Sequence, residues 1–411
     1  MNTAPKSERM HIGIFGRRNA GKSSLINALT GQDIALVSET AGTTTDPVYK
    51  SMEILPIGPV VIIDTAGLDD SGDLGGKRVK KSLDVLKKCD FAVVVVPANT
   101  IAGDSLQWEL DLIERIAGKN IPCVLAVNKI DIAGIDESAI KEKFKNIPFA
   151  SVSALNGTGI DRLKELLISE SDSTWHEDTI LGDLISPGDT IVLVVPIDDA
   201  APKGRLILPQ VQTIRDILDH DAVAVTVKER ELAHVLHSIG VTPRLVVTDS
   251  QAFQKVSADT PEHIPMTSFS ILFARYKGDL LTYLRGIKKI DSLRDGDKVL
   301  IAEACTHHVQ SDDIGTVKIP RWLNQLTGKK LEFEKFSGCG YPDDLTDYRL
   351  VIHCGSCMLN RRETVARARA AENAGVSITN YGMVIAYSFG ILERALKPFA
   401  IAQAYFSGDI Y

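Results

Sequence analysis

Three cysteines and two histidines in the last third of the chain have the residue types and spacing of a metal or cluster site. Cys305-Thr-His307 is followed later by His353-Cys354-Gly-Ser-Cys357, in a chain that holds only six cysteines. Thiolates and imidazoles bind both iron–sulfur clusters and structural zinc. From ligand chemistry alone, a 4Fe–4S cluster with a displaced fourth position and a closed zinc site are about equally favoured.

The other histidines and cysteines each have an alternative role. A histidine beside a cluster can donate a hydrogen bond to a sulfur without binding iron, so His307 and His353 are predicted only as candidates for a fourth or exchangeable ligand. Cys339 lies between the two motifs, but a lone loop cysteine is more often unrelated to such a site. Cys89 and Cys123 adjoin apolar runs and are expected to be small core residues.

A phosphate-binding motif lies near the start of the chain: Gly16-Arg-Arg-Asn-Ala-Gly21-Lys22-Ser23. It matches G-x-x-x-x-G-K-[ST], with a strand pattern before it and a helix pattern after it. In such a loop backbone N–H groups surround the phosphates, the lysine contacts the β- and γ-oxygens, and the hydroxyl binds magnesium. The alternative, a glycine-rich turn without a ligand, is disfavoured by the complete motif in its expected context.

Two further motifs predict that the nucleotide is GTP. Asp64-Thr-Ala-Gly67 ends an apolar run, so its carboxylate can reach the magnesium shell and the Gly67 amide can contact the γ-phosphate. Asn128-Lys129-Ile-Asp131 ends another run, and its carboxylate can accept two parallel hydrogen bonds from guanine. Adenine lacks that pair of donors.

A third motif, Ser153-Ala154-Leu155, follows the next apolar run and can place a backbone amide on the guanine oxygen. The order and spacing of these motifs make the set specific, although the Asn-Lys-Ile-Asp match is weak by itself. The nucleotide-binding residues predicted from these motifs are Gly16, Ala20, Gly21, Lys22, Ser23, Ser24, Asp64, Gly67, Asn128, Lys129, Asp131, Ser153, Ala154 and Leu155.

Strand and helix patterns alternate along the chain and must position these motifs. This alternation predicts an α/β fold in which an N-terminal P-loop GTPase domain has a mostly parallel sheet with helices on both faces. We place that domain at 1–172, a small α/β middle domain at 173–262, and an α/β cluster-binding domain at 263–411. If the apolar runs before Cys305 and His353 form neighbouring parallel strands, their carboxyl ends converge at one site.

Composition limits the classes of function. The chain has 411 residues, 44% of them hydrophobic, and a formal charge of −7. Its pI of about 5.8 disfavours a non-specific nucleic-acid surface. The first ten residues lack the apolar core of a signal peptide, and no apolar run approaches the roughly 18 residues of a membrane span. We therefore expect a cytoplasmic protein without membrane contact.

The segment from residue 11 to about 170 resembles the translation-factor-related GTPases, within the group that includes MnmE and Era. The stretch 42–46, Gly-Thr-Thr-Thr-Asp, is similar to the G-T-T-R-D switch of that group, with Thr45 replacing arginine. Leu68 stands where Ras-like enzymes carry glutamine, so hydrolysis is expected to be slow or to need another element. Asn19 matches a potassium-binding position, although a simple turn-former is the alternative. The resemblance thus implies magnesium held by Ser23, Thr44 and Asp64, potassium held by Asn19, and catalysis by Lys22, Thr44 and Gly67.

Both motif sets together resemble the HydF family of FeFe-hydrogenase maturation GTPases across essentially the whole chain. This resemblance implies a scaffold that binds a 4Fe–4S cluster through Cys305, Cys354 and Cys357. It implies that the scaffold receives a diiron precursor made by two radical-SAM maturases and delivers it to the hydrogenase apoprotein. It also implies a homodimer formed through the middle domain, and control by GTP through switch segments at 38–50 and 67–80.

Two other classes of function remain open at the level of sequence. An RNA- or ribosome-associated GTPase with a zinc-binding C-terminal domain is disfavoured by the acidic balance and by the lack of a basic, aromatic-interleaved domain. A regulatory GTPase that is controlled by a cluster sensor is excluded by none of the motifs.

Overall fold

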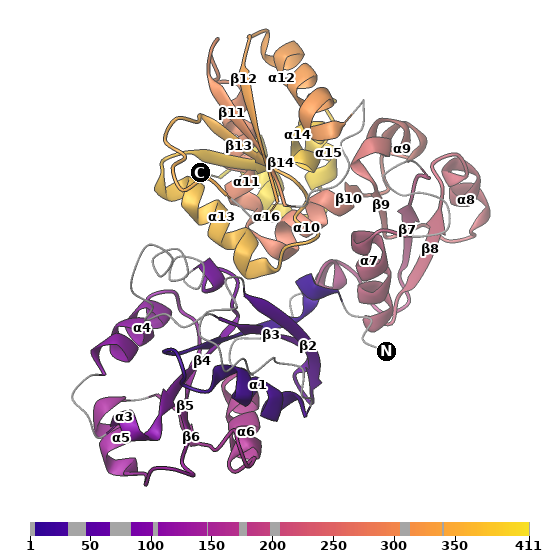
Figure 1. Cartoon of the computed structure of the whole chain (residues 1–411). Helices are drawn as coiled ribbons and strands as arrows, with labels where there is room; N and C mark the ends of the chain where they lie inside the picture. Colours follow the sequence, from indigo (N-terminus) through magenta and orange to yellow (C-terminus); the bar gives the residue numbers. More distant parts are fainter. Residues whose placement is uncertain are drawn as a thin grey trace. The chain divides into compact units, whose positions relative to one another are not determined.

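The computed structural model describes residues 5–31, 47–65, 84–101, 106–145, 147–171, 179–197, 206–304, 313–338 and 341–410. It divides into two compact units, Met1–Glu177 and Asp178–Tyr411, each of which is described by itself (Figure 1). Among the described helices, none is both long and apolar enough to cross a membrane.

The first unit contains a six-stranded sheet with the order β2-β3-β1-β4-β5-β6. Strand β2 runs antiparallel to β3, and the other pairs are parallel. The strands are β1 (Met10–Phe15), β2 (Val48–Ile54), β3 (Gly58–Asp64), β4 (Phe91–Pro97), β5 (Cys123–Asn128) and β6 (Phe149–Ser151). The helices are α1 (Lys22–Thr30), α3 (Ala98–Ile101), α4 (Gln107–Ala117), α5 (Glu137–Lys143) and α6 (Ile160–Ser171), after a short 3-10 turn at Lys6–Glu8.

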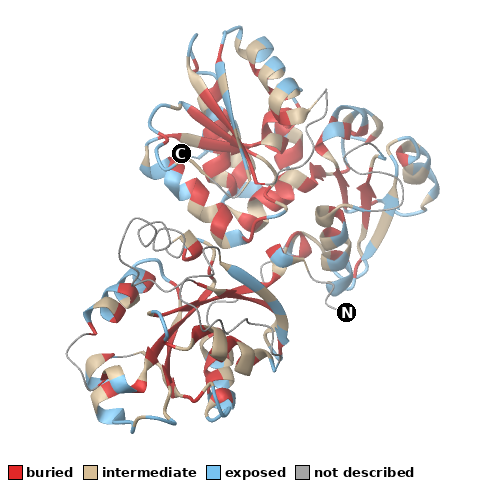
Figure 2. Cartoon of the chain, in the orientation of Figure 1, coloured by how far each residue is buried: buried red, intermediate tan, exposed pale blue. Residues whose placement is uncertain are grey.

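The central strand β4 shows why this sheet carries helices on both faces. Val93 and Val95 enter a core that includes residues of α1 and α6, whereas Val94 and Val96 enter a second core with residues of α4 and α5. Successive side chains of a strand point to opposite faces, so an uninterrupted valine run fills both cores. Figure 2 shows the buried residues concentrated along the strands. The predicted α/β GTPase fold with a mostly parallel sheet is confirmed.

The second unit contains two parallel four-stranded sheets, with the orders β10-β9-β7-β8 and β12-β11-β13-β14. Their strands are β7 (Thr190–Val194), β8 (Val223–Val227), β9 (Leu245–Thr248), β10 (Met266–Ser268), β11 (Lys298–Glu303), β12 (Glu332–Ser337), β13 (Leu350–His353) and β14 (Ser377–Asn380). The helices are α7 (Leu208–Asp219), α8 (Leu232–Ser238), α9 (Phe253–Asp259), α10 (Phe269–Lys277), α11 (Leu280–Ile290), α12 (Ile319–Thr327), α13 (Arg361–Asn373), α14 (Tyr381–Ser388), α15 (Leu392–Leu396) and α16 (Ala400–Ser407). Short 3-10 turns at Gly182–Leu184 and Ser250–Ala252, and a π-helical turn at Ile314–Lys318, complete the unit.

One continuous hydrophobic core joins the two sheets of the second unit. This core contains Val192 of β7 in the first sheet and Ile301 of β11 in the second. It also contains Leu272 of α10, the helix that follows the last strand of the first sheet in the sequence. The predicted boundaries between a middle domain at 173–262 and a third domain at 263–411 stay a prediction. The strands before the two Cys/His motifs, β11 and β13, are parallel neighbours, with Ala302 opposite His353.

Candidate functional site

The phosphate-binding loop connects β1 to α1 in a conformation that requires glycine. Gly21 has a φ of 91°, and a Cβ on it would lie 2.2 Å from Nδ2 of Asn128. A Cβ on Gly16 would lie 2.5 Å from the carbonyl oxygen of Val95. Both glycines therefore permit close backbone approach, which leaves the loop free to surround an anion with its N–H groups.

Lys22, Ser23 and Asp64 lie where a magnesium–phosphate group would be bound. The Lys22 ammonium is buried and donates to the carbonyl oxygens of Gly16 at 3.0 Å and Arg17 at 2.9 Å. Ser23 Oγ donates to Asp64 Oδ2 at 2.7 Å. Burial raises the pKa of Asp64, while the hydrogen bond from Ser23 and the charges of nearby lysines act to lower it. A hydroxyl and a carboxylate are the oxygen ligands that Mg²⁺ prefers, so these residues fit the ion.

The guanine-binding motifs are joined by Asn128. Its Nδ2 donates to the carbonyl of Ala20 at 2.9 Å, and its Oδ1 accepts from the backbone N–H of Ala154 at 3.0 Å. Ser153 Oγ donates to Asp131 Oδ1 at 2.5 Å, which fixes the carboxylate predicted to recognise guanine. The Asn128 side chain thus connects the phosphate loop to the loop after β6 through hydrogen bonds to both. The Ala154 amide, one of those in the motif predicted to contact guanine, donates to Asn128 here.

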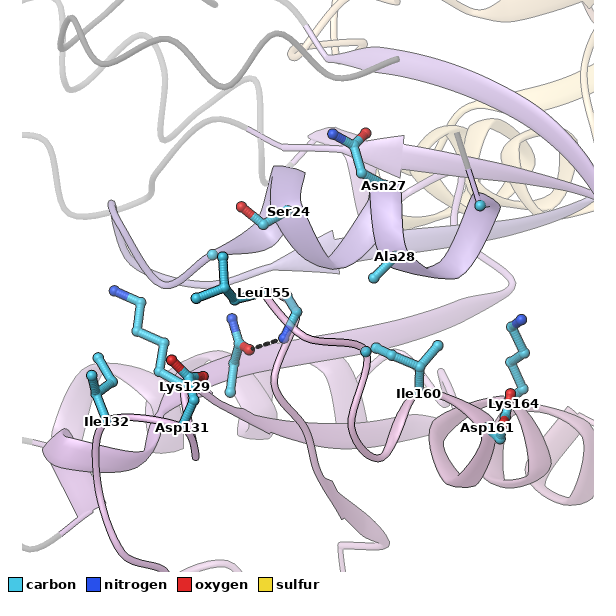
Figure 3. Close-up of a pocket in the computed structure, with 15 residues that line it drawn as sticks. Ser24, Asn27, Ala28, Lys129, Asp131, Ile132, Leu155, Ile160, Asp161 and Lys164 are labelled. Carbon is cyan, nitrogen blue, oxygen red and sulfur yellow. Dashed lines mark hydrogen bonds between the residues drawn. The ribbon is translucent and has the colours of Figure 1, made fainter. Parts of the chain in front are cut away.

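A pocket of about 960 Å³ lies beside these loops. Figure 3 shows residues from α1, from the segments after β5 and β6, and from α6 around it. Its lining includes the predicted residues Gly21, Ser24, Asn128, Lys129, Asp131, Ala154 and Leu155. The structure therefore brings together the predicted guanine-side residues. The predicted Thr44 and Gly67, together with Leu68, lie outside the described residues.

One pair in this region was missed by sequence reasoning. Arg17 of the phosphate loop bonds to Glu109 of α4, with 2.8 Å between Nη2 and Oε2. The Glu109 side chain is 1% exposed. This pair holds the loop against α4. No sequence signal could have shown it, since the two residues lie far apart in the chain and neither belongs to a shared motif.

The second chemical site lies at the carboxyl ends of β11 and β13. The backbone N–H of Ala304, just after β11, donates to Cys354 Sγ at 3.2 Å. Cys354 and Cys357 are both partly buried and free of disulfides. Burial raises the pKa of the Cys357 thiol, and the Lys277 charge opposes that change. Cys305, His307 and Cys339 lie outside the described residues, within which no group of three metal ligands occurs.

His353 uses both ring nitrogens for contacts inside the protein. Arg367 donates from Nη1 to His353 Nε2 at 3.2 Å, and Nδ1 lies 2.9 Å from the carbonyl oxygen of Cys354. Because a guanidinium can only donate, Nε2 must be the acceptor and Nδ1 the donor. Burial, assisted by the charge of Arg367, lowers the pKa of His353 to about 4. His353 is therefore neutral, and its hydrogen bonds connect the cysteine loop to Arg367.

Two buried cations near this loop were also missed. Arg367 pairs with Glu363 at 3.1 Å and donates to the carbonyl oxygen of Gly338 at 3.3 Å. Lys277 contacts the carbonyls that follow Cys354. A signal for Lys277 was present, because it falls four residues after Phe273, on the same side of an apolar helix.

The two remaining described cysteines belong to the first unit. Cys89 is fully buried in the core of the first unit, as predicted. Cys123 packs against the same core, and burial raises the pKa of its thiol to about 12. Cys123 is therefore a protonated, unreactive thiol at neutral pH.

Three family models match successive parts of the chain. The model described as 50S ribosome-binding GTPase matches residues 11–129. The hydrogen maturase F dimerization domain matches 180–278, and the hydrogen maturase F tetramerization domain matches 281–398.

The known relatives resemble the GTPase part. The tRNA modification GTPase MnmE of Methylococcus capsulatus is 38% identical over 157 residues, covering 38% of this chain and 33% of the relative. GTPase Der of Sulfurimonas denitrificans is 33% identical over 185 residues, covering 42% and 36%. The matched part of this chain thus spans about a third of the length of each relative. A solved structure of Aquifex aeolicus Era bound to GDP and AlF4⁻ covers 56% of this chain and 98% of its own, with 19% identity and a TM-score of 0.35.

The GTPase match contains the phosphate loop and Asn128. The tetramerization match contains β11, β13 and the cysteine loop between His353 and Arg361. With both hydrogen maturase F domains following a GTPase domain similar to that of MnmE, the chain belongs to the HydF family.

Proposed function

We propose that this GTPase is a scaffold that holds a 4Fe–4S cluster, receives a diiron precursor and delivers it to FeFe-hydrogenase. The contact between the Ala304 N–H and Cys354 Sγ gives the strongest structural support. Ala304 directly precedes Cys305, and consecutive Cα atoms are about 3.8 Å apart. The contact therefore brings the residue directly before the first cysteine motif to the second motif.

The donor set fits an iron–sulfur cluster. Cys305, Cys354 and Cys357 would bind iron through thiolates, as such clusters require. Both ring nitrogens of His353 are engaged with protein groups, which leaves His307 or an exchangeable ligand for the fourth position. When bound, the cluster supplies iron and sulfur atoms at which a diiron cargo can attach. His353 and its partner Arg367 would keep the thiol-bearing loop in place.

The GTPase domain would control partner exchange. Lys22 and the loop amides would bind the phosphates, Ser23 and Asp64 would hold Mg²⁺, and Asp131 would select guanine. Hydrolysis would remove the γ-phosphate contacts that order switch segments in this class of protein. We assign this role to 38–50 and 67–80, which lie mostly outside the described residues. The partners are the hydrogenase apoprotein, the two radical-SAM maturases and a second copy of this chain, all in the cytoplasm.

Anaerobic reconstitution with iron and sulfide tests the cluster assignment. We expect about four irons per chain and the EPR signal of a reduced 4Fe–4S cluster. Cys354→Ser and Cys357→Ser should lose the cluster, whereas Cys123→Ser, which changes a thiol in the other unit, should keep it. Tight binding of one zinc ion with no cluster assembly would contradict the proposal.

Production with the two radical-SAM maturases tests the delivery role. The native chain should activate a hydrogenase apoprotein, and Cys354→Ser should not, although its GTP hydrolysis should stay near the native rate. Lys22→Ala should abolish hydrolysis while leaving cluster assembly intact. A chain that assembles the cluster but never activates hydrogenase would instead favour a cluster-sensing GTPase.

A further inference from the structure

Lys277 is a buried lysine that contacts the loop between Cys354 and α13. It ends α10, its side chain is 2% exposed, and its ammonium lies 5.8 Å from the centre of the Phe273 ring. Its Nζ donates to the carbonyl oxygens of Ser356 at 3.3 Å, Cys357 at 3.5 Å and Leu359 at 2.8 Å. One ammonium group therefore donates hydrogen bonds to three carbonyl oxygens of the segment that carries the thiols.

These contacts compensate an unfavourable backbone conformation. Ser356 lies between the two cysteines with a φ of 55°, a left-handed value that side-chain-bearing residues rarely adopt. Such a conformation persists only where surrounding contacts enforce it. The Lys277 bonds to Ser356 and Cys357 are contacts of that kind. With the carbonyls turned toward the ammonium, the loop stays folded around Lys277 while Cys357 remains partly accessible.

The lysine comes from a different module than the cysteines. Helix α10 falls within the match to the dimerization domain at 180–278, whereas the loop falls within the match to the tetramerization domain at 281–398. Helix α10 packs against α7, which covers the first sheet of this unit, and against α13 and α14 of the cysteine-bearing part. Lys277 is therefore a direct physical link from the dimerization module to the cysteine loop.

The charge of Lys277 has a second effect. An ammonium in a buried site is screened much less than one in water, so it stabilises negative charge nearby. A cluster bound by three thiolates is anionic, and each added electron increases its negative charge. A fixed cation behind the loop therefore favours the reduced state over the oxidised state.

We propose that Lys277 is a positioning residue of the cluster site, supplied by the dimerization module, which holds the cysteine loop through its carbonyls and raises the reduction potential of the bound cluster. This proposal rests on the proposed cluster site. It concerns a residue outside both cysteine motifs.

Three substitutions separate the two roles of the side chain. Lys277→Arg keeps the charge and the donors, Lys277→Gln keeps donors without the charge, and Lys277→Met keeps neither. Lys288→Met is the matched control, because Lys288 also donates to a backbone carbonyl, that of Tyr405 at 2.8 Å, but lies exposed on α11. Two quantities are measured: amide hydrogen exchange over 354–359 in the cluster-free chain, and the midpoint potential of the reconstituted cluster by EPR.

The two readouts should follow different properties of residue 277. Exchange over 354–359 should accelerate at least tenfold in Lys277→Met, while the Arg and Gln variants should stay closer to the native chain. The preference for the reduced cluster should fall about tenfold in both Gln and Met variants, a shift of about 59 mV to more negative potential for a one-electron couple. Lys277→Arg and Lys288→Met should leave the potential unchanged.

An unchanged potential in both the Gln and Met variants would overturn the proposal, since a purely structural role would leave the potential alone. Unchanged exchange in Lys277→Met would overturn it as well. If the native chain assembled no cluster, the proposed function would fail instead, and the exchange measurement would still decide whether Lys277 holds the loop.

Discussion

Asn19 lies inside the phosphate loop with a φ of 60°. Asparagine tolerates this left-handed conformation better than most residues, so a turn-forming role accounts for its backbone. The same side chain is our candidate for a potassium ligand. Potassium could supply positive charge in the transition state, where other GTPases use an arginine finger. The two roles can be separated, because glycine adopts the same backbone without offering a ligand.

We expect GTP hydrolysis to be roughly tenfold or more faster in KCl than in NaCl, a smaller effect than the about 10³-fold or more of an arginine finger. Asn19→Gly should keep the loop and GTP affinity but lose the potassium effect. Steady-state phosphate release at equal ionic strength measures both. Stimulation that persists in Asn19→Gly, or equal native rates in the two salts, would remove Asn19 from this role.

Residues with a role set by their immediate neighbours could be predicted from the sequence. Asn128, Asp131 and Ser153 were found because their motifs each end an apolar run, and parallel strands bring such ends together. Lys277 and Arg367 could not be found in that way. Lys277 contacts Ser356 and Arg367 contacts Gly338, both far away in the chain, and a single lysine or arginine in a helix is normally a surface residue.

At the scale of elements, two edge strands of the second unit differ in how they are protected. Strand β12 carries Glu332, Glu334 and Lys335, and charges on an edge oppose pairing with another sheet. Strand β8 has the sequence VAVTV, without a charge, and Val223 is 49% exposed. An apolar, uncharged edge is a template for pairing with another strand. It lies in the dimerization match, so we expect two copies to pair through β8.

A proline at Thr226 tests this pairing. The N–H of Val223 and the carbonyl of Val227 bond toward the β7 side, so the alternate residues Ala224 and Thr226 direct theirs outward. Thr226→Pro should remove one outward donor and lower the dimer affinity at least tenfold, by light scattering over a dilution series. Thr226→Val should stay dimeric. A dimer that survives Thr226→Pro at native affinity would place the interface elsewhere.

The strands that sequence patterns predicted include the continuous apolar runs before the motifs, such as β3, β5 and β13. Strands β10, β12 and β14 were not predicted. Strand β10 has three residues, too few for a periodic pattern, and β12 alternates glutamate with phenylalanine inside a polar stretch. Strand β14 offers only Ser-Ile-Thr-Asn. Such segments become strands because a neighbouring strand pairs with them, which local sequence does not record.

At the scale of the molecule, no hydrophobic core of the described residues is shared between the two compact units: the first unit has two cores and the second has one. The predicted nucleotide residues that are described all belong to the first unit, and the described cysteines of the cluster site belong to the second. A ligand that binds a folded unit stabilises that unit against unfolding. GTP should therefore stabilise the first unit and leave the stability of the second unit unchanged.

We expect two calorimetric unfolding transitions. A non-hydrolysable GTP analogue at 100 times its dissociation constant should stabilise the first unit by about 2.7 kcal/mol and leave the second transition in place. Lys22→Ala should abolish that shift. A single transition that moves as a whole with nucleotide would show that the two units unfold cooperatively, contrary to this expectation.

The position of α10 also limits how this family can be engineered. The two hydrogen maturase F matches meet between residues 278 and 281, which would look like a natural site for joining modules from different species. A chimera cut there would take its cysteine loop from one parent and the lysine beneath that loop from the other. It would also divide a core that both sheets share. Module exchange in this protein should therefore keep the whole second unit, residues 178–411, from a single parent.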